Sequence, residues 1–141
     1  MFDALRMSLN ATAVFGFILY IVVAALLFAL FQFVYTRLTP HKEFELIREN
    51  NPAAAVALGG SLIGFALPAS SIISYSVSVL DFVVWVLIAA VVQLLAFTFT
   101  SFVLKGLGER IARGEVAAAI YAASVAISVG FLNSACMTPS A

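Results

Sequence analysis

The chain has very few of the residue types from which catalytic and metal sites are usually built. Its 141 residues include one cysteine, Cys136, and one histidine, His41. A single cysteine excludes an internal disulfide and any metal site that needs several cysteines, and a single histidine excludes a histidine cluster. Charged residues make up only 10%, and the net charge of zero gives no indication of a nucleic-acid partner. We expect no enzyme, cofactor site or metal site.

Apolar residues dominate instead and make up 64% of the chain. Soluble domains have roughly 25% charged residues, and one this small buries too little surface to hide so many apolar side chains. A lipid bilayer is therefore the expected environment. A helix of about 20 residues crosses its hydrocarbon core. Four segments are long enough: Thr12–Arg37, Pro52–Ser74, Val79–Lys105 and Glu115–Met137.

The predicted fold is an all-α integral membrane protein, a single domain of residues 1–141 with four transmembrane helices. Backbone groups in lipid must be hydrogen-bonded within the protein, which favours a helix in every segment. The first segment is longer than a signal-peptide core of about 7–15 residues, so we expect it to span the membrane. Asn51 before Pro52, and Ser78 three residues before Asp81, are typical helix starts, and Gly106 is a typical helix end.

Basic residues gather in the first and third connections between the four segments. Because such loops remain in the cytoplasm, we expect both connections to be cytoplasmic and both termini to be periplasmic. Thr39-Pro40, followed by Phe44 and Ile47 on one side, predicts a short helix on the membrane surface in the first connection. The basic residues are Arg37, Lys42, Arg48, Lys105, Arg110 and Arg113.

A shift of 64 residues aligns the chain with itself. It superposes Ile47 on Ile111, and Ala53–Val56 on Ala117–Ile120. Each unit then consists of a helix, a charged connection and an alanine-rich helix. Two spans per unit make both units point the same way, which predicts tandem repeats in parallel orientation. The units are about residues 12–75 and about residues 78–138.

The second segment combines small residues with a proline. Gly59, Gly60 and Gly64 are followed by Pro68 one turn later. Small residues four positions apart let helices approach closely in lipid, either within one bundle or between copies in a homo-oligomer. Pro68 cannot donate a hydrogen bond to the Gly64 carbonyl, so the helix bends and this carbonyl needs another partner.

Polar residues in the spans form a candidate cluster. The freed Gly64 carbonyl is expected to meet Asn133, Ser134 and Cys136 in the outer half of the membrane, as part of a pathway or as ordinary helix packing. Asp81 either caps its helix or lies at the mouth of a pathway. Gln93, deep in the third segment, either hydrogen-bonds another helix or lines a wet cavity.

Several stretches resemble the YjfL-like family of small bacterial inner-membrane proteins. They are residues 51–68, Asp81 with Trp85, residues 109–111 with 114–119, and Asn133–Met137, within a similarity over Val14–Met137. The resemblance implies a duplicated four-helix protein of unknown function, connected with the membrane envelope and its stress response. Ser134, where the family usually has alanine, departs from its pattern.

Two functional hypotheses follow from this pattern. In the first, an oligomer in the inner membrane forms a passive pathway for an ion or small solute, or senses the state of the membrane. In the second, the protein is a scaffold that docks a soluble protein on its cytoplasmic connections. An ion-coupled transporter is disfavoured because no ionisable residue lies near the centre of a span.

Overall fold

The computed structural model describes residues 1–137, and its long elements are four helices. Each is long and apolar enough to cross a membrane, which confirms the four predicted spans to within a few residues. The predicted end of the second repeat unit, residue 138, lies outside the described residues. The long helices are α2 (Ala11–Leu38), α4 (Pro52–Tyr75), α5 (Val79–Val103) and α7 (Val116–Cys136).

Three short helices complete the described chain: α1 (Phe2–Ser8), α3 (Glu43–Arg48) and α6 (Leu107–Ala112). The predicted surface helix thus begins at Glu43 and not at Thr39-Pro40, because Pro40 and His41 pack against α6 before the helix starts. Within this helix Glu43 is buried and Phe44 is exposed.

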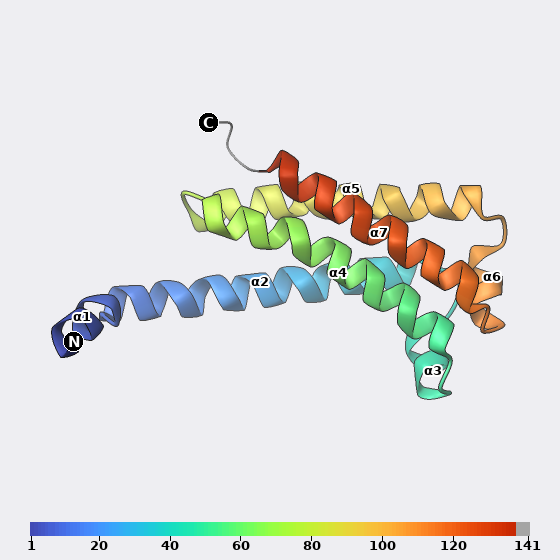
Figure 1. Ribbon diagram of the computed structural model, residues 1–141, viewed down its shortest axis with the longest axis horizontal. Coiled ribbons are helices and arrows are strands. Elements are labelled where there is room, and N and C mark those ends of the chain that lie inside the picture. Colours follow the sequence, from blue (N-terminus) through green and yellow to red (C-terminus); the bar gives the residue numbers. More distant parts are fainter. Residues whose placement is uncertain (138–141) are drawn as a thin grey trace.

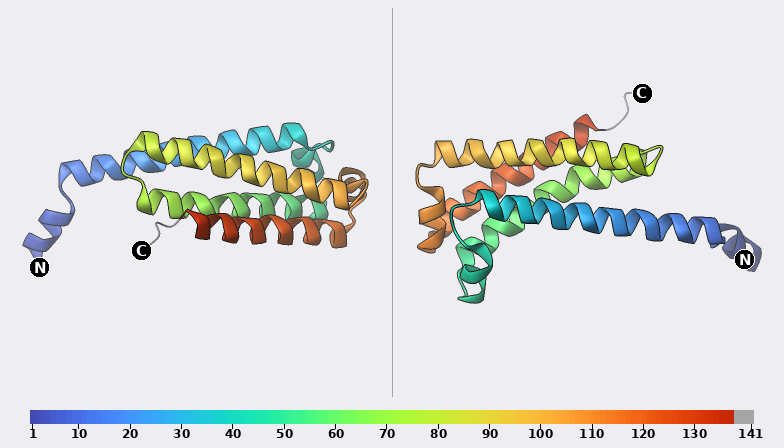
Figure 2. Two further views of the ribbon diagram at one scale, coloured as in Figure 1. Left: turned by 90° about the horizontal axis from the view of Figure 1, so that it is seen from above. Right: turned by 180° about the vertical axis from the view of Figure 1, so that it is seen from behind.

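Helices α2 and α5 run toward α3 and α6, and α4 and α7 run back (Figures 1 and 2). We call the end that contains α3 and α6 the platform end, and the opposite end, where α1 and the end of α7 lie, the terminal end. The two expected helix starts are confirmed: Asn51 and Ser78 accept capping hydrogen bonds from Ala54 and Asp81. The expected helix end at Gly106 is wrong, because α5 ends at Val103 and Gly106, with a φ of 73°, is the residue that precedes α6.

Helices α4 and α7 form the most closely packed pair in the bundle. A Cβ atom on Gly60 would lie 2.5 Å from Cα of Ala123, and one on Gly64 would lie 2.7 Å from the carbonyl carbon of Ala126. Both glycines therefore pack within one chain, and this face is not available for a second copy. Gly59, in contrast, faces open space and takes no part in the close contact.

Helix α2 has its two buried residues, Phe31 and Tyr35, in its C-terminal third, and Tyr20 is a further contact, with Phe82 of α5 at 5.7 Å. Phe31 stacks on Phe65 of α4 at 4.3 Å between ring centroids, and Tyr35 meets Phe97 of α5 at 5.0 Å. Toward its N-terminal end α2 diverges from α4 and α7 (Figure 1). Only 6% of an apolar 18-residue stretch of α2 is buried, against 44% of the corresponding stretch of α4. Helix α2 is therefore the most loosely packed of the four spans.

Local structure recurs at the interval of 64 residues that aligns the sequence with itself. Helix α6 begins and ends 64 residues after α3. Asn50 and Gly114, also 64 residues apart, both have positive φ, at 64° and 81°. The hydrogen bond from the Asn51 amide to the Leu46 carbonyl (2.9 Å) has its counterpart between Glu115 and Arg110 (3.0 Å).

Candidate functional site

The carbonyl that Pro68 leaves free is bound by Gln93. The Gln93 Nε2 donates to the Gly64 carbonyl oxygen at 2.8 Å and to the Ala126 carbonyl oxygen at 3.3 Å. Gln93 is buried, and these bonds tie α5 to α4 and α7 at the closest point of the bundle. Of the two alternatives for this residue, the structure shows the interhelical hydrogen bond.

The rest of the predicted polar cluster does not converge on that carbonyl. Ser134 shares a hydrogen bond with Ser71 of α4, whereas Cys136 is exposed. Asn133 is buried, and within residues 1–137 its Nδ2 has no hydrogen-bond partner. The expectation that Asn133, Ser134 and Cys136 meet the Gly64 carbonyl is therefore wrong. Gln93 binds this carbonyl instead. The glycines there bring α4 and α7 so close together that its amide can donate to a carbonyl of each helix.

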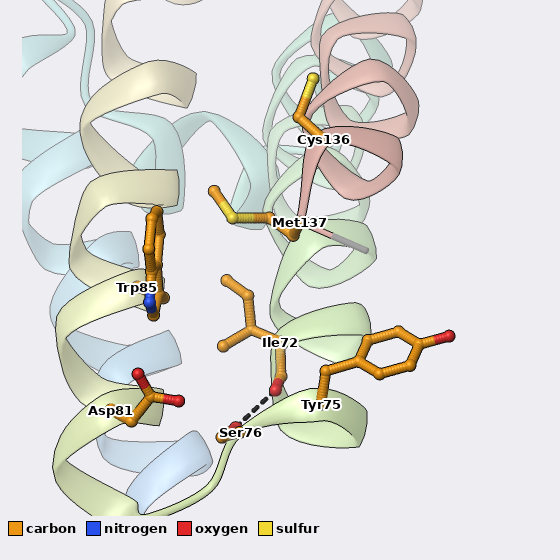
Figure 3. Close-up of a pocket in the computed structure, with 7 residues that line it drawn as sticks. All are labelled: Ile72, Tyr75, Ser76, Asp81, Trp85, Cys136 and Met137. Atoms are coloured by element: carbon orange, nitrogen blue, oxygen red, sulfur yellow. Dashed lines mark hydrogen bonds between the residues drawn. The ribbon is translucent and has the colours of Figure 1, made fainter. Parts of the chain in front are cut away.

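A cavity of about 230 Å³ opens at the terminal end between α4, α5 and the end of α7. Figure 3 shows Asp81 and Trp85 on one side, and Ile72 and Met137 on the other, with the Met137 side chain pointing toward Trp85. Tyr75, Ser76 and Cys136 complete the lining.

Asp81 acts first as a helix cap. Its Oδ2 accepts from the Val77 amide at 3.2 Å, and its own amide donates to the Ser78 hydroxyl at 3.1 Å. The Ser78 hydroxyl caps the helix, and the Asp81 carboxylate binds the amide of Val77, one residue before the Ser78 amide that a capping box would use. The carboxylate also lines the cavity, so it supplies negative charge at its mouth. Asp81 and Cys136 are the two predicted site residues that the structure brings to one cavity.

A second polar group, at the platform end, was missed by the sequence analysis. His41 and Glu43 are buried between α2, α3 and α6, and the His41 Nε2 lies 3.2 Å from the Glu43 Oε1. The buried side chain of Tyr35 interacts with Glu43 and with the hydroxyl of Ser61. In sequence, His41 and Glu43 flank the exposed Lys42 in a charged loop, a pattern typical of solvated residues.

The basic residues of the platform end are largely engaged with neighbours on the surface. Arg110 and Arg113 both contact the carboxylate of Glu115, at 3.8 and 3.4 Å. Lys42 lies 3.5 Å from Glu45. The guanidinium of Arg37 lies over the Phe33 ring, 4.8 Å from its centroid. A groove of about 310 Å³ separates α3 from α6, and its acidic lining residues are Glu45, Glu49 and Glu109.

Comparison with known proteins places these features in a wider group. The sequence model of one protein family, described as Domain of Unknown Function (DUF350), matches residues 8–137. The UPF0719 inner membrane protein YjfL of Escherichia coli (strain K12) is 37% identical over 123 residues, which are 87% of this chain and 93% of that protein. The protein of the same description from Escherichia coli O157:H7 is equally similar. No solved structure matches.

Proposed function

Because this chain belongs to the family of the Domain of Unknown Function DUF350, which has no assigned activity, we propose a function from its geometry. The chain is an integral inner-membrane protein with four candidate spans. We propose that it senses the state of the bilayer through α2 and reports it at the platform end to a soluble protein. The proposal includes no catalytic step and no cofactor.

The loose packing of α2 is the observation that carries this proposal. With 28 residues α2 is about 42 Å long, whereas α7, with 21, is about 32 Å long. A hydrocarbon core of about 30 Å fits α7, but α2 must tilt to match it, and more so in a thinner membrane. Because few contacts hold its N-terminal half, a change of tilt costs less free energy in α2 than in the other three spans.

The C-terminal end of α2 connects this movement to the platform end. Tyr35 near the end of α2 and Glu43 at the start of α3 are both buried, and only four residues separate the end of α2 at Leu38 from the start of α3 at Glu43. A short connection with buried side chains at both ends transmits a change of tilt directly. The groove between α3 and α6 is the surface that such a movement would widen or narrow.

The orientation and the duplication are part of the same proposal. Six of the seven basic residues lie at the platform end, which favours its cytoplasmic location and a periplasmic location for both termini. The recurrence of helices, positive φ angles and turn hydrogen bonds at 64 residues supports a tandem repeat in parallel orientation. In this view α4 and α7 are equivalent helices that form the rigid half of the molecule.

Distance measurements between spin labels test the sensor. In a Cys136→Ser background, Phe15→Cys on α2 and Leu80→Cys on α5 place two exposed labels at the terminal end. A change in tilt of about 10° moves the end of a 42 Å helix by about 7 Å. We therefore expect this distance to shift by several ångström between bilayers of short-chain and long-chain lipids.

The matched control keeps the label on α5 and moves the other to α7. Leu80→Cys with Leu132→Cys joins α5 to α7, which Gln93 ties together, and its distance is expected to stay constant across the same lipids. If the α2 distance is also constant, α2 does not respond to the bilayer and the sensor proposal fails.

A second candidate function is a passive pathway for an ion or small solute, formed in a homo-oligomer. Two observations favour it: the cavity with Asp81 at the terminal end, and the buried Asn133 whose Nδ2 lacks a partner within residues 1–137. Asp81→Asn removes the charge at the mouth, and Asn133→Leu removes the amide. We expect either change to lower solute flux into liposomes several-fold if the pathway exists. Flux that equals that of protein-free liposomes before any mutation would exclude it.

A further inference from the structure

The groove between α3 and α6, of about 310 Å³, has carboxylates on both of its walls. Glu45 belongs to α3, Glu49 follows this helix, and Glu109 belongs to α6. Lys42 also lines the groove, and its Nζ lies 3.5 Å from the Glu45 Oε1, so these two charges offset each other. Within residues 1–137 neither Glu49 nor Glu109 forms an ion pair. The groove therefore contains two carboxylates that no basic side chain of this part of the chain neutralises.

His41 is a further polar side chain on this groove, and it is almost fully buried. Its side chain is 3% exposed, and within the described residues its Nδ1 has no hydrogen-bond partner. The Glu43 Oε1, 3.2 Å from the His41 Nε2, favours the hydrogen of a neutral imidazole on Nε2, which leaves Nδ1 as an acceptor. A buried acceptor without a donor is unfavourable, so a ligand in the groove is stabilised if it donates there.

Apolar groups form the rest of the lining, namely Pro40, Leu46, Gly108 and Ala112. The groove thus suits a ligand with a cationic head, several hydrogen-bond donors and an apolar stem. An arginine side chain has all three, because its planar guanidinium carries five donors and its stem packs on apolar surface. A volume of about 310 Å³ is at the lower end for ligand sites, which are about 300–1,000 Å³, and this size suits one or two side chains.

A metal ion suits the groove less well than an extended cation does. Within residues 1–137 no three His, Cys, Asp or Glu side chains are grouped so that they could hold a metal ion. The carboxylates of Glu49 and Glu109 come from different walls, so the ligand that uses both must extend across the groove.

We propose that the groove between α3 and α6 binds an arginine side chain from a basic segment of a soluble protein. The guanidinium lies between the carboxylates of Glu49 and Glu109 and donates to the His41 Nδ1, and its stem lies along Leu46 and Ala112. This inference rests on the proposed function, because it gives the chemistry of the partner that reads the platform end. Opposite charges on the groove and the partner also favour specific encounter.

Peptide binding to the full-length protein tests this docking site. The protein is placed in nanodiscs of phosphatidylcholine, which has no net charge, and a dye-labelled peptide of glycine, serine and two arginines is added at low ionic strength. Fluorescence anisotropy gives the dissociation constant, and empty nanodiscs give the background. We expect Glu49→Gln and Glu109→Gln each to weaken binding by about threefold, as for exposed ion pairs, and the double variant by about tenfold.

Glu115→Gln is the matched control for charge. It removes the same charge from the platform end, but Glu115 contacts Arg110 and Arg113 and does not line the groove, so binding should change by less than about twofold. Ala112→Leu narrows the groove without a change of charge and should weaken binding several-fold. Circular dichroism checks that each variant keeps its helix content. Equal effects of Glu109→Gln and Glu115→Gln would show general electrostatic attraction and overturn the inference.

Two other cations test the preference for arginine. A peptide with lysine in place of arginine should bind several-fold more weakly, and an equal concentration of spermidine should not displace the arginine peptide, because an ammonium lacks the planar fork of donors. Equal binding of either cation would contradict the proposal. The lipid is the same throughout, so the result does not depend on the tilt of α2. Peptide binding with a constant α2 distance would contradict the sensor alone, and absence of peptide binding would contradict the docking site alone.

Discussion

Replacing Gly60 or Gly64 with leucine is expected to lower the free energy of unfolding by about 3 kcal/mol or more, since overpacking a tight core costs about 1–3 kcal/mol. A side chain at either position meets the backbone of α7: Cα of Ala123 at 2.5 Å from a Cβ on Gly60, and the Ala126 carbonyl carbon at 2.7 Å from one on Gly64. Backbone atoms cannot rotate away as a side chain can. The helices must therefore separate, and Gln93 loses its carbonyl partners.

Gly59 provides the control on the same helix. A Cβ there has nothing within 4 Å, so Gly59→Leu is expected to be neutral or stabilising, within about 1 kcal/mol, because glycine is a poor helix former. Unfolding by sodium dodecyl sulfate in mixed micelles measures all three variants. Equal stability of the Gly59 and Gly60 variants would show that α4 and α7 do not pack in this way.

The four spans could be predicted because their signals are local. Length, apolar composition and caps such as Asn51 and Ser78 depend on neighbouring residues alone, and the bilayer requires helices in all apolar segments. Gly60 and Gly64 also indicated close helix packing. Whether the partner lies in the same chain or in a second copy stayed open, because a small residue allows close approach in either case. Only the three-dimensional arrangement distinguishes α7 from a second copy.

The candidate site was less predictable because its contacts join distant segments. Pro68 indicated that the Gly64 carbonyl needs a donor, and the depth of Gln93 indicated that it needs an acceptor. Each need was evident in the sequence, but the pairing of the two was not, since Asn133 and Ser134 offered equally suitable groups. The shift of 64 residues that aligns the chain with itself places Pro68 on Leu132, next to Asn133. It therefore favoured Asn133 and Ser134 as partners of the carbonyl.

Glu43 was missed for a different physical reason. A charged residue in a loop is nearly always solvated, and Lys42 and Glu45 on either side are indeed exposed. Burial of Glu43 depends on Gly108, 65 positions away, whose missing side chain lets Pro40 and His41 approach α6. The available signal was the lone His41 two residues before a glutamate, beside a proline that fixes the turn.

A double-mutant cycle of Gln93 and Pro68 tests the central hydrogen bond. Gln93→Leu is expected to lower the free energy of unfolding by about 1–2 kcal/mol, near the upper end for hydrogen bonds between membrane helices. In a Pro68→Ala background the alanine supplies a backbone amide that can donate to the Gly64 carbonyl four residues earlier, as in a regular helix. The same Gln93 change should then cost about 1 kcal/mol less, measured by unfolding in mixed micelles.

Thr98→Val removes a hydroxyl on α5 that bonds only to its own helix, at Leu94, and should cost the same in both backgrounds. Equal costs of Gln93→Leu in the two backgrounds would mean that Gln93 does not serve the carbonyl that Pro68 leaves free.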